Sequence, residues 1–111
     1  MTRYVPSRGD VVWLQFDPQA GHEQAGRRPA LVISPERYNR VTGLMVCCPV
    51  TSKIKNYPFE VAIELAGTQS AVISDQVKSL DWEMRKAQFF QKAPLEVLNQ
   101  VQGKLKALLE I

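Results

Sequence analysis

The segment from Gly21 to Pro29 holds the densest cluster of polar side chains in the chain. It contains His22, Glu23, Gln24 and the pair Arg27-Arg28, and His22 is the only histidine. Imidazole changes charge near neutral pH and can act as an acid or a base, whereas guanidinium stays charged and matches phosphate oxygens. An acid, a base and a phosphate-binding cation are what displacement at phosphorus requires. The alternative is a solvated surface loop, because charged loops are common.

Two predicted strands flank this cluster and would have to position it. Residues 10–17 alternate, with Val12, Leu14 and Phe16 on one face and Val11 and Trp13 on the other. Residues 29–34 are apolar on both faces, which is typical of a central strand. We therefore expect residues 19–28 to form a loop between rigid strands, a place where functional side chains often lie.

The remaining pattern predicts a mainly β fold with a C-terminal helix. Further strands are expected over 44–51, 59–65, 70–74, 77–82 and 85–90. Ser34 is expected to cap a short helix at 34–38, and an apolar stripe predicts a helix from Pro94 to Leu109, weakened at Gly103. Short strands with one amphipathic helix favour a small, strongly bent β-barrel in a single domain, residues 1–111, with a homodimer as a reasonable expectation.

Composition excludes few functions but indicates in which cellular compartment the protein works. The chain has 111 residues, 45% of them hydrophobic and 23% charged, with a net charge of +3 that permits binding to nucleic acid without requiring it. It has no apolar run that could span a membrane and no signal-peptide core, so we expect a cytoplasmic protein. Cys47 and Cys48 are neighbours, which point to opposite faces of a strand, so we expect neither a disulfide nor a metal site.

Five separated motifs occur in the order typical of one toxin family. They are Phe16–Ser34, Asn39–Thr42, Cys48–Ser52, Tyr57–Val61 and Asp75–Ser79. Together they closely resemble the MazF/PemK toxins of type II toxin–antitoxin systems, from about Arg8 to about Arg85. The C-terminal helix matches only in pattern.

The resemblance implies a fold, an activity and partners. The fold would be the SH3-like β-barrel of the MazF/PemK/CcdB toxins, assembled as a homodimer. The activity would be sequence-specific, ribosome-independent cleavage of single-stranded mRNA, which leaves a 2′,3′-cyclic phosphate and a 5′-hydroxyl. The partner would be an antitoxin of the MazE type, whose C-terminal tail occupies the RNA groove. Neither a metal nor a cofactor would be required.

The resemblance also carries catalytic roles onto particular residues. The Arg before Pro, here Arg28, and the Thr ending the third strand, here Thr51, are catalytic in the family. The PemK branch adds a loop His, which matches His22, and an Asp, which matches Asp75, together with an Arg where this chain has Ile73. We therefore favour Arg28 and Thr51 with Glu23 nearby, while His22 is either a base reader or an auxiliary acid/base.

Several side chains around these positions are expected to bind RNA: Gln24, Arg27, Ser52, Lys53, Lys55, Gln76 and Lys78. Each has a simpler reading. Lysines are usually solvated, Glu23 can bond loop amides, and Asp75-Gln76 can cap a turn. Trp13 and Trp82 could stack on bases or pack in a core or dimer interface. Two alternative functions stay open, a gyrase poison of the CcdB type on the same barrel and a non-catalytic binding module.

Overall fold

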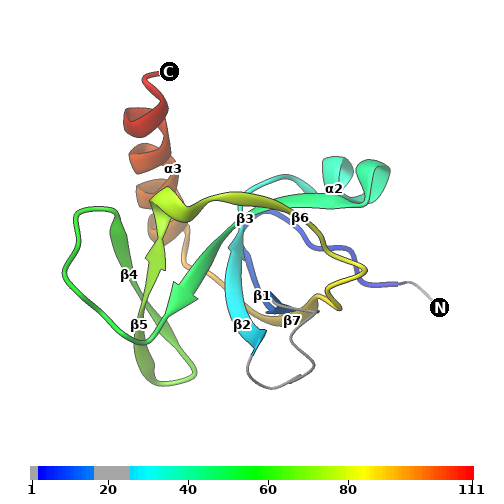
Figure 1. Cartoon of the computed structure of the whole chain (residues 1–111), viewed down its shortest axis with the longest axis horizontal. Helices are drawn as coiled ribbons and strands as arrows, with labels where there is room; N and C mark the ends of the chain where they lie inside the picture. Colours follow the sequence, from blue (N-terminus) through cyan, green and yellow to red (C-terminus); the bar gives the residue numbers. More distant parts are fainter. Residues whose placement is uncertain (1–2, 17–25) are drawn as a thin grey trace.

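A strongly curled β-sheet with one long C-terminal helix forms the molecule, as the sequence predicts. The computed structural model describes residues 3–16 and 26–111, and Figure 1 draws the remaining residues as a grey trace. Within that part the strands are β1 (Asp10–Gln15), β2 (Arg27–Val32), β3 (Leu44–Thr51), β4 (Glu60–Leu65), β5 (Thr68–Ile73), β6 (Lys78–Asp81) and β7 (Gln88–Lys92). The helices are α2 (Glu36–Thr42) and α3 (Leu95–Leu109), and η1 (Ser74–Gln76) is a single 3₁₀ turn.

The strands lie in the order β4-β5-β3-β2-β1-β7, with every neighbouring pair antiparallel. The other edge of β3 has two partners in turn, because Leu44–Cys47 pairs with β6 and Val50-Thr51 pairs with β5. The turn η1 lies between those two partners, so Asp75-Gln76 forms a turn as expected. The β4–β5 hairpin and α3 lie at one side of the molecule and α2 at the other (Figure 1).

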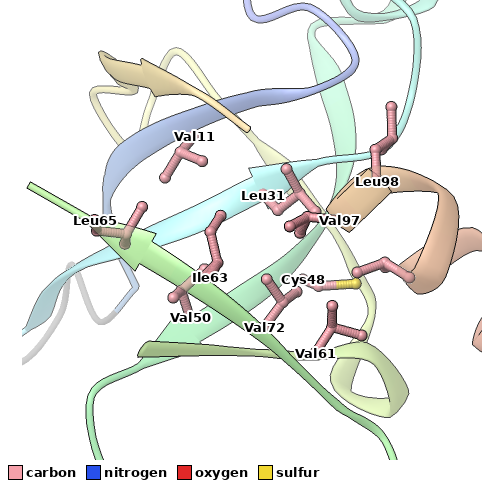
Figure 2. Packing of buried hydrophobic residues seen from close by; sticks show 11 residues of the cluster. Val11, Leu31, Cys48, Val50, Val61, Ile63, Leu65, Val72, Val97 and Leu98 are labelled. Atoms are coloured by element: carbon pink, nitrogen blue, oxygen red, sulfur yellow. The ribbon is translucent and has the colours of Figure 1, made fainter. Parts of the chain in front are cut away.

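Strands β1, β2 and β3 separate two hydrophobic cores, because their buried residues alternate between the faces. The first core holds Val11, Leu31 and Cys48 with residues of β4 and α3, and Figure 2 shows these side chains meeting. The second core holds Val12, Cys47 and other residues around Trp82. Both thiols are free and buried on opposite faces, which confirms that they form no bridge. Burial raises the pKa of each to about 12.

Two strand boundaries that bear on the site differ from the sequence prediction. Strand β2 begins at Arg27, because Arg27 and Arg28 pair with Gln15 and Leu14 of β1, so Arg28 stands on a strand and not in a loop. The strand expected at 85–90 is present but shifted, because β7 covers Gln88–Lys92 and a turn precedes it, with Lys86 at a φ of 56°. In the described residues neither helix has the length and apolar character needed to cross a membrane.

Helix α3 buries its apolar stripe only along its first half. Val97, Leu98 and Val101 are buried and Leu105 is partly buried, whereas Leu108 and Leu109 are exposed. The Lys104 ammonium donates to the Pro58 carbonyl, at 2.7 Å, and so fastens the helix to the segment between β3 and β4.

A buried polar network around Asn39 joins α2 to the second core. The Asn39 amide donates to the carbonyls of Pro6 (2.8 Å) and Ser34 (3.1 Å), and its oxygen accepts from the Ser34 hydroxyl (2.6 Å). The Trp82 indole N–H donates to the Asn39 carbonyl, at 2.8 Å. The expectation that Ser34 caps the helix was wrong, because its hydroxyl is bonded to Asn39. Trp82 is core, with 3% of its surface exposed.

We expect Asn39→Ala to lower the free energy of unfolding by about 2–4 kcal/mol, because it leaves buried donors and acceptors without partners. Denaturant unfolding measures the change. Asn99→Ala, at an exposed position of α3, is the matched control and should shift the midpoint little. Equal midpoints for the two variants would contradict the structural role of the network.

Candidate active site

Arg28 and Thr51 are brought together where two strands part. The β2–β3 ladder ends at the pair Ala30–Pro49, and beyond it β2 pairs only with β1 while β3 pairs only with β5. Pro29 and Pro49 stand at this point, and proline has no N–H with which to extend a ladder. Continuing the antiparallel register by two positions sets Arg28 opposite Thr51, on the same face.

An open cleft of about 560 Å³ occupies the space between the parted strands. Its lining comes from six strands and the segments that follow them: Trp13, Arg28, Pro29, Val50, Thr51, Ser52, Lys53, Leu65, Ala66, Thr68, Ser70 and Phe90. Its charged lining residues are Arg28 and Lys53, with no carboxylate among the described residues that line it. A cleft of this charge suits a phosphodiester backbone.

The Arg28 and Thr51 side chains differ in what they can do chemically. No carboxylate within residues 3–16 and 26–111 pairs with the exposed Arg28 guanidinium. The Thr51 hydroxyl oxygen accepts from the Lys53 backbone N–H, at 3.0 Å, and a hydroxyl that accepts still has a proton to donate. Arg28 can therefore hold anionic charge, and Thr51 can donate to a neighbouring anionic oxygen.

An aromatic pair forms another part of the cleft. The Trp13 and Phe90 rings lie nearly parallel, with centroids 5.0 Å apart and planes 21° apart. Both side chains are half-buried and line the cleft. Trp13 was a candidate for base stacking from its type alone. Nothing in the sequence marked Phe90 as a candidate for base stacking, because only the tertiary pairing of β7 with β1 places it beside Trp13.

A smaller side pocket of about 290 Å³ shares Thr51 and Lys53 with the cleft. Its other lining residues are Lys55, Tyr57, Glu60, Ile73 and Gln76. The Glu60 carboxylate accepts from the Lys55 and Tyr57 backbone N–H groups at 3.1 and 3.4 Å, and so fixes the chain between β3 and β4. Sequence reasoning missed Tyr57 and Glu60 as parts of the site.

Asp75 lies apart from Arg28. It does not line the cleft, and its Oδ2 accepts a short hydrogen bond from the Tyr57 hydroxyl. Ile73 is half-buried on the side pocket, where it brings no charge. The structure thus places Arg28 and Thr51 on one cleft, whereas the neighbour of Asp75 is Tyr57.

The other expected RNA-binding residues are placed unevenly. Ser52 and Lys53 line the cleft, whereas Lys55 and Gln76 line the side pocket. Arg27 donates to the Gln88 side-chain oxygen at 2.6 Å, and the Lys78 ammonium lies 5.4 Å from the centre of the Phe16 ring. His22, Glu23 and Gln24 lie outside the described residues.

The chain is similar to known proteins over almost its whole length. Residues 7–109 match the family described as PemK-like, MazF-like toxin of type II toxin–antitoxin system. The chain is 42% identical over 109 residues to the endoribonuclease toxin MazF of Escherichia coli, covering 98% of each chain.

Solved structures show the same likeness. The crystal structure of MazF (Form-I) from Deinococcus radiodurans is 55% identical with a TM-score of 0.87, covering 98% of this chain and 100% of that one. That of MazE–MazF (Form-II) from the same organism is 49% identical with a TM-score of 0.86, covering 98% and 99%.

The bond between Tyr57 and Asp75 has a measurable consequence. Hydrogen bonding to the carboxylate raises the pKa of Tyr57, because the protonated phenol is the donor. The contribution of this bond to stability is present below about pH 10, the ordinary tyrosine value, and is lost as pH rises through the raised pKa. Asp75→Asn should lower the Tyr57 pKa toward its ordinary value. NMR titration of the tyrosine rings checks this, with Asp81→Asn as control and an unchanged Tyr57 pKa as the contrary result.

Proposed function

The chain belongs to the PemK/MazF toxin family of type II toxin–antitoxin systems, and we propose that it is an endoribonuclease that cleaves single-stranded mRNA. The observation that carries the proposal is the pairing of Arg28 with Thr51 in one open, positively charged cleft. The Trp13–Phe90 pair on that cleft offers a surface on which a base can stack.

In the proposed reaction the ribose 2′-oxygen attacks the adjacent phosphorus. A bond forms between O2′ and phosphorus while the bond from phosphorus to O5′ breaks, which leaves a 2′,3′-cyclic phosphate and a 5′-hydroxyl. Arg28 holds the charge that builds on the non-bridging oxygens, and the Thr51 hydroxyl donates to one of them. A base accepts the 2′-hydroxyl proton and an acid protonates O5′; Glu23 and His22 are the candidates for these roles. This scheme needs no metal.

Asp75 has no part in that scheme. Its carboxylate is engaged by the Tyr57 hydroxyl, and the position two residues earlier, Ile73, supplies no cation for a second catalytic centre. The proposal thus assigns catalysis to Arg28 and Thr51, as in MazF, and not to the Asp and its neighbouring Arg used in the PemK branch. Lys53, Lys55 and Gln76 would then contact RNA on either side of Thr51.

Asp75→Asn should cleave RNA within about threefold of the parental rate, because removing a group that contributes nothing in the transition state leaves the barrier unchanged. Initial rates on one RNA substrate measure this. A loss of a hundredfold or more, with the fold intact by circular dichroism, would restore Asp75 as a base.

The partners follow from the same proposal. Relatives have been crystallised as MazE–MazF complexes, and we propose that a cognate antitoxin of the MazE type inhibits this chain as well. We also propose a homodimer, supported by large apolar side chains that stand exposed on α2 and the start of β3, namely Tyr38, Val41 and Leu44. Because mRNA is translated in the cytoplasm, the proposal places the activity there.

One assay separates this function from the two alternatives. Purified protein is incubated with a long single-stranded RNA in excess chelator, and in parallel with gyrase and DNA. We expect cleavage at a short recurrent sequence and a product with a 5′-hydroxyl end, which polynucleotide kinase labels without prior phosphatase treatment. Intact RNA with trapped gyrase–DNA complexes would instead support the gyrase poison. Intact RNA without trapped gyrase–DNA complexes would support a binding module.

Variants at the two central residues should separate their roles. Arg28→Ala should lower kcat by about 10²- to 10³-fold, the usual cost of removing a group that stabilises the transition state. Thr51→Val should lose activity that Thr51→Ser retains, because serine keeps the hydroxyl. Arg37→Ala, an exposed arginine on α2, is the matched charge control. Parental rates for Arg28→Ala would overturn the assignment.

A further inference from the structure

The tip of the β4–β5 hairpin forms one wall of the cleft. Leu65, Ala66, Thr68 and Ser70 contribute to that wall. Ala66 and Gly67 make the two-residue turn between the paired residues Leu65 and Thr68, with φ values of 49° and 84°. The core holds the hairpin only as far as Leu65, which is 5% exposed, whereas residues 66–69 are all exposed.

The opposite wall, on β7, is held firmly. Strand β7 pairs with β1 on both sides of a bulge at Phe90, and Phe90 stacks on Trp13. The Lys92 ammonium forms an ion pair with the buried Asp10 carboxylate at 2.7 Å, and the Ala93 N–H donates to the Gly9 carbonyl at 2.8 Å. A hydrogen-bonded contact between β7 and the hairpin, called a tie below, therefore attaches the exposed hairpin tip to the better supported wall on β7.

The Gln91 side chain makes such a tie. Its amide oxygen accepts from the Ala66 backbone N–H at 3.2 Å, and its amide nitrogen donates to the Glu64 carbonyl at 3.2 Å. Both ends of the amide are thus used, in the orientation in which donor meets acceptor. In this way the side chain does for β4 and β7, the two ends of the strand order, what a backbone ladder does for neighbouring strands.

We propose that Gln91 is a positioning residue that sets the width of the RNA-binding cleft by tying the β4–β5 hairpin to β7. Two residues link the tie to the cleft lining: Ala66, whose N–H is bonded to Gln91, and Phe90, which directly precedes Gln91. Arg28 is held by β1, and Thr51 pairs with Ala71, a buried residue of β5 away from the exposed hairpin tip. The contact of Gln91 with the tip is therefore not what holds either residue. The role in RNA binding rests on the proposed function, whereas the tie itself rests on the two hydrogen bonds.

The test is Gln91→Met, which keeps the length of the side chain and removes both hydrogen bonds without adding charge. We expect KM for a single-stranded RNA substrate to rise about three- to tenfold while kcat stays within about twofold, because the variant weakens binding of the substrate and of the transition state equally. The salt dependence of KM should not change, since no phosphate contact is lost. Gln100→Met, at an exposed position of α3, is the matched control.

Hydrogen exchange of the Ala66 amide, followed by NMR, reads the tie without RNA. It should be faster in Gln91→Met than in the parental chain and unchanged in Gln100→Met. Unchanged exchange in Gln91→Met would overturn the tie. If the parental chain cleaves RNA and Gln91→Met shows the parental KM, the positioning role is overturned while the proposed function stands. If the parental chain neither binds nor cleaves RNA, the proposed function fails, and exchange at Ala66 alone decides the tie.

Discussion

The divergence of β2 and β3 beyond Ala30 and Pro49 is the constraint on which the site depends. Up to that pair the two strands form one ladder. Past it β2 pairs only with β1 and β3 pairs only with β5, so the two strands separate. A curled sheet of short strands can part at such a point because neither strand loses its backbone hydrogen bonds, except where proline has none to give. The result is a cleft whose candidate catalytic side chains stand on paired strands.

The paired strands hold the backbone of Arg28 and Thr51 rigidly. Fixing these residues in a mobile loop would cost more conformational entropy. Arg28 extends from a strand paired with β1, and Thr51 from a strand paired with β5. Behind them β1, β2 and β3 are packed on both faces, by the first and second cores. A guanidinium and a hydroxyl on such a support need little reorganisation when charge develops on a phosphate, which is the condition for electrostatic stabilisation.

Periodicity predicted much of this fold because burial follows the alternation of side chains along a strand. Val61, Ile63 and Leu65 are buried and their neighbours Ala62 and Glu64 are exposed, as the pattern of β4 requires. The failures occurred where tertiary partners overrode local preference. Arg27 and Arg28 looked like loop residues from their charge, yet β1 recruits them into a strand. Ser34 looked like a helix cap, but buried Asn39 is its partner.

The sequence by itself determined the family and the mainly β architecture, and it made Arg28 and Thr51 the leading candidates for catalysis, since motifs and alternation are local properties of the chain. It also indicated that Cys47 and Cys48 would not form a disulfide, because adjacent residues of a strand face opposite ways. Only the tertiary structure decided what lies beside these residues. The stacking of Phe90 on Trp13, the bond from Tyr57 to Asp75 and the tie from Gln91 to the hairpin join residues distant in sequence. Such contacts depend on strand register and sheet curvature, which arise from the packing of the whole chain and not from any one segment.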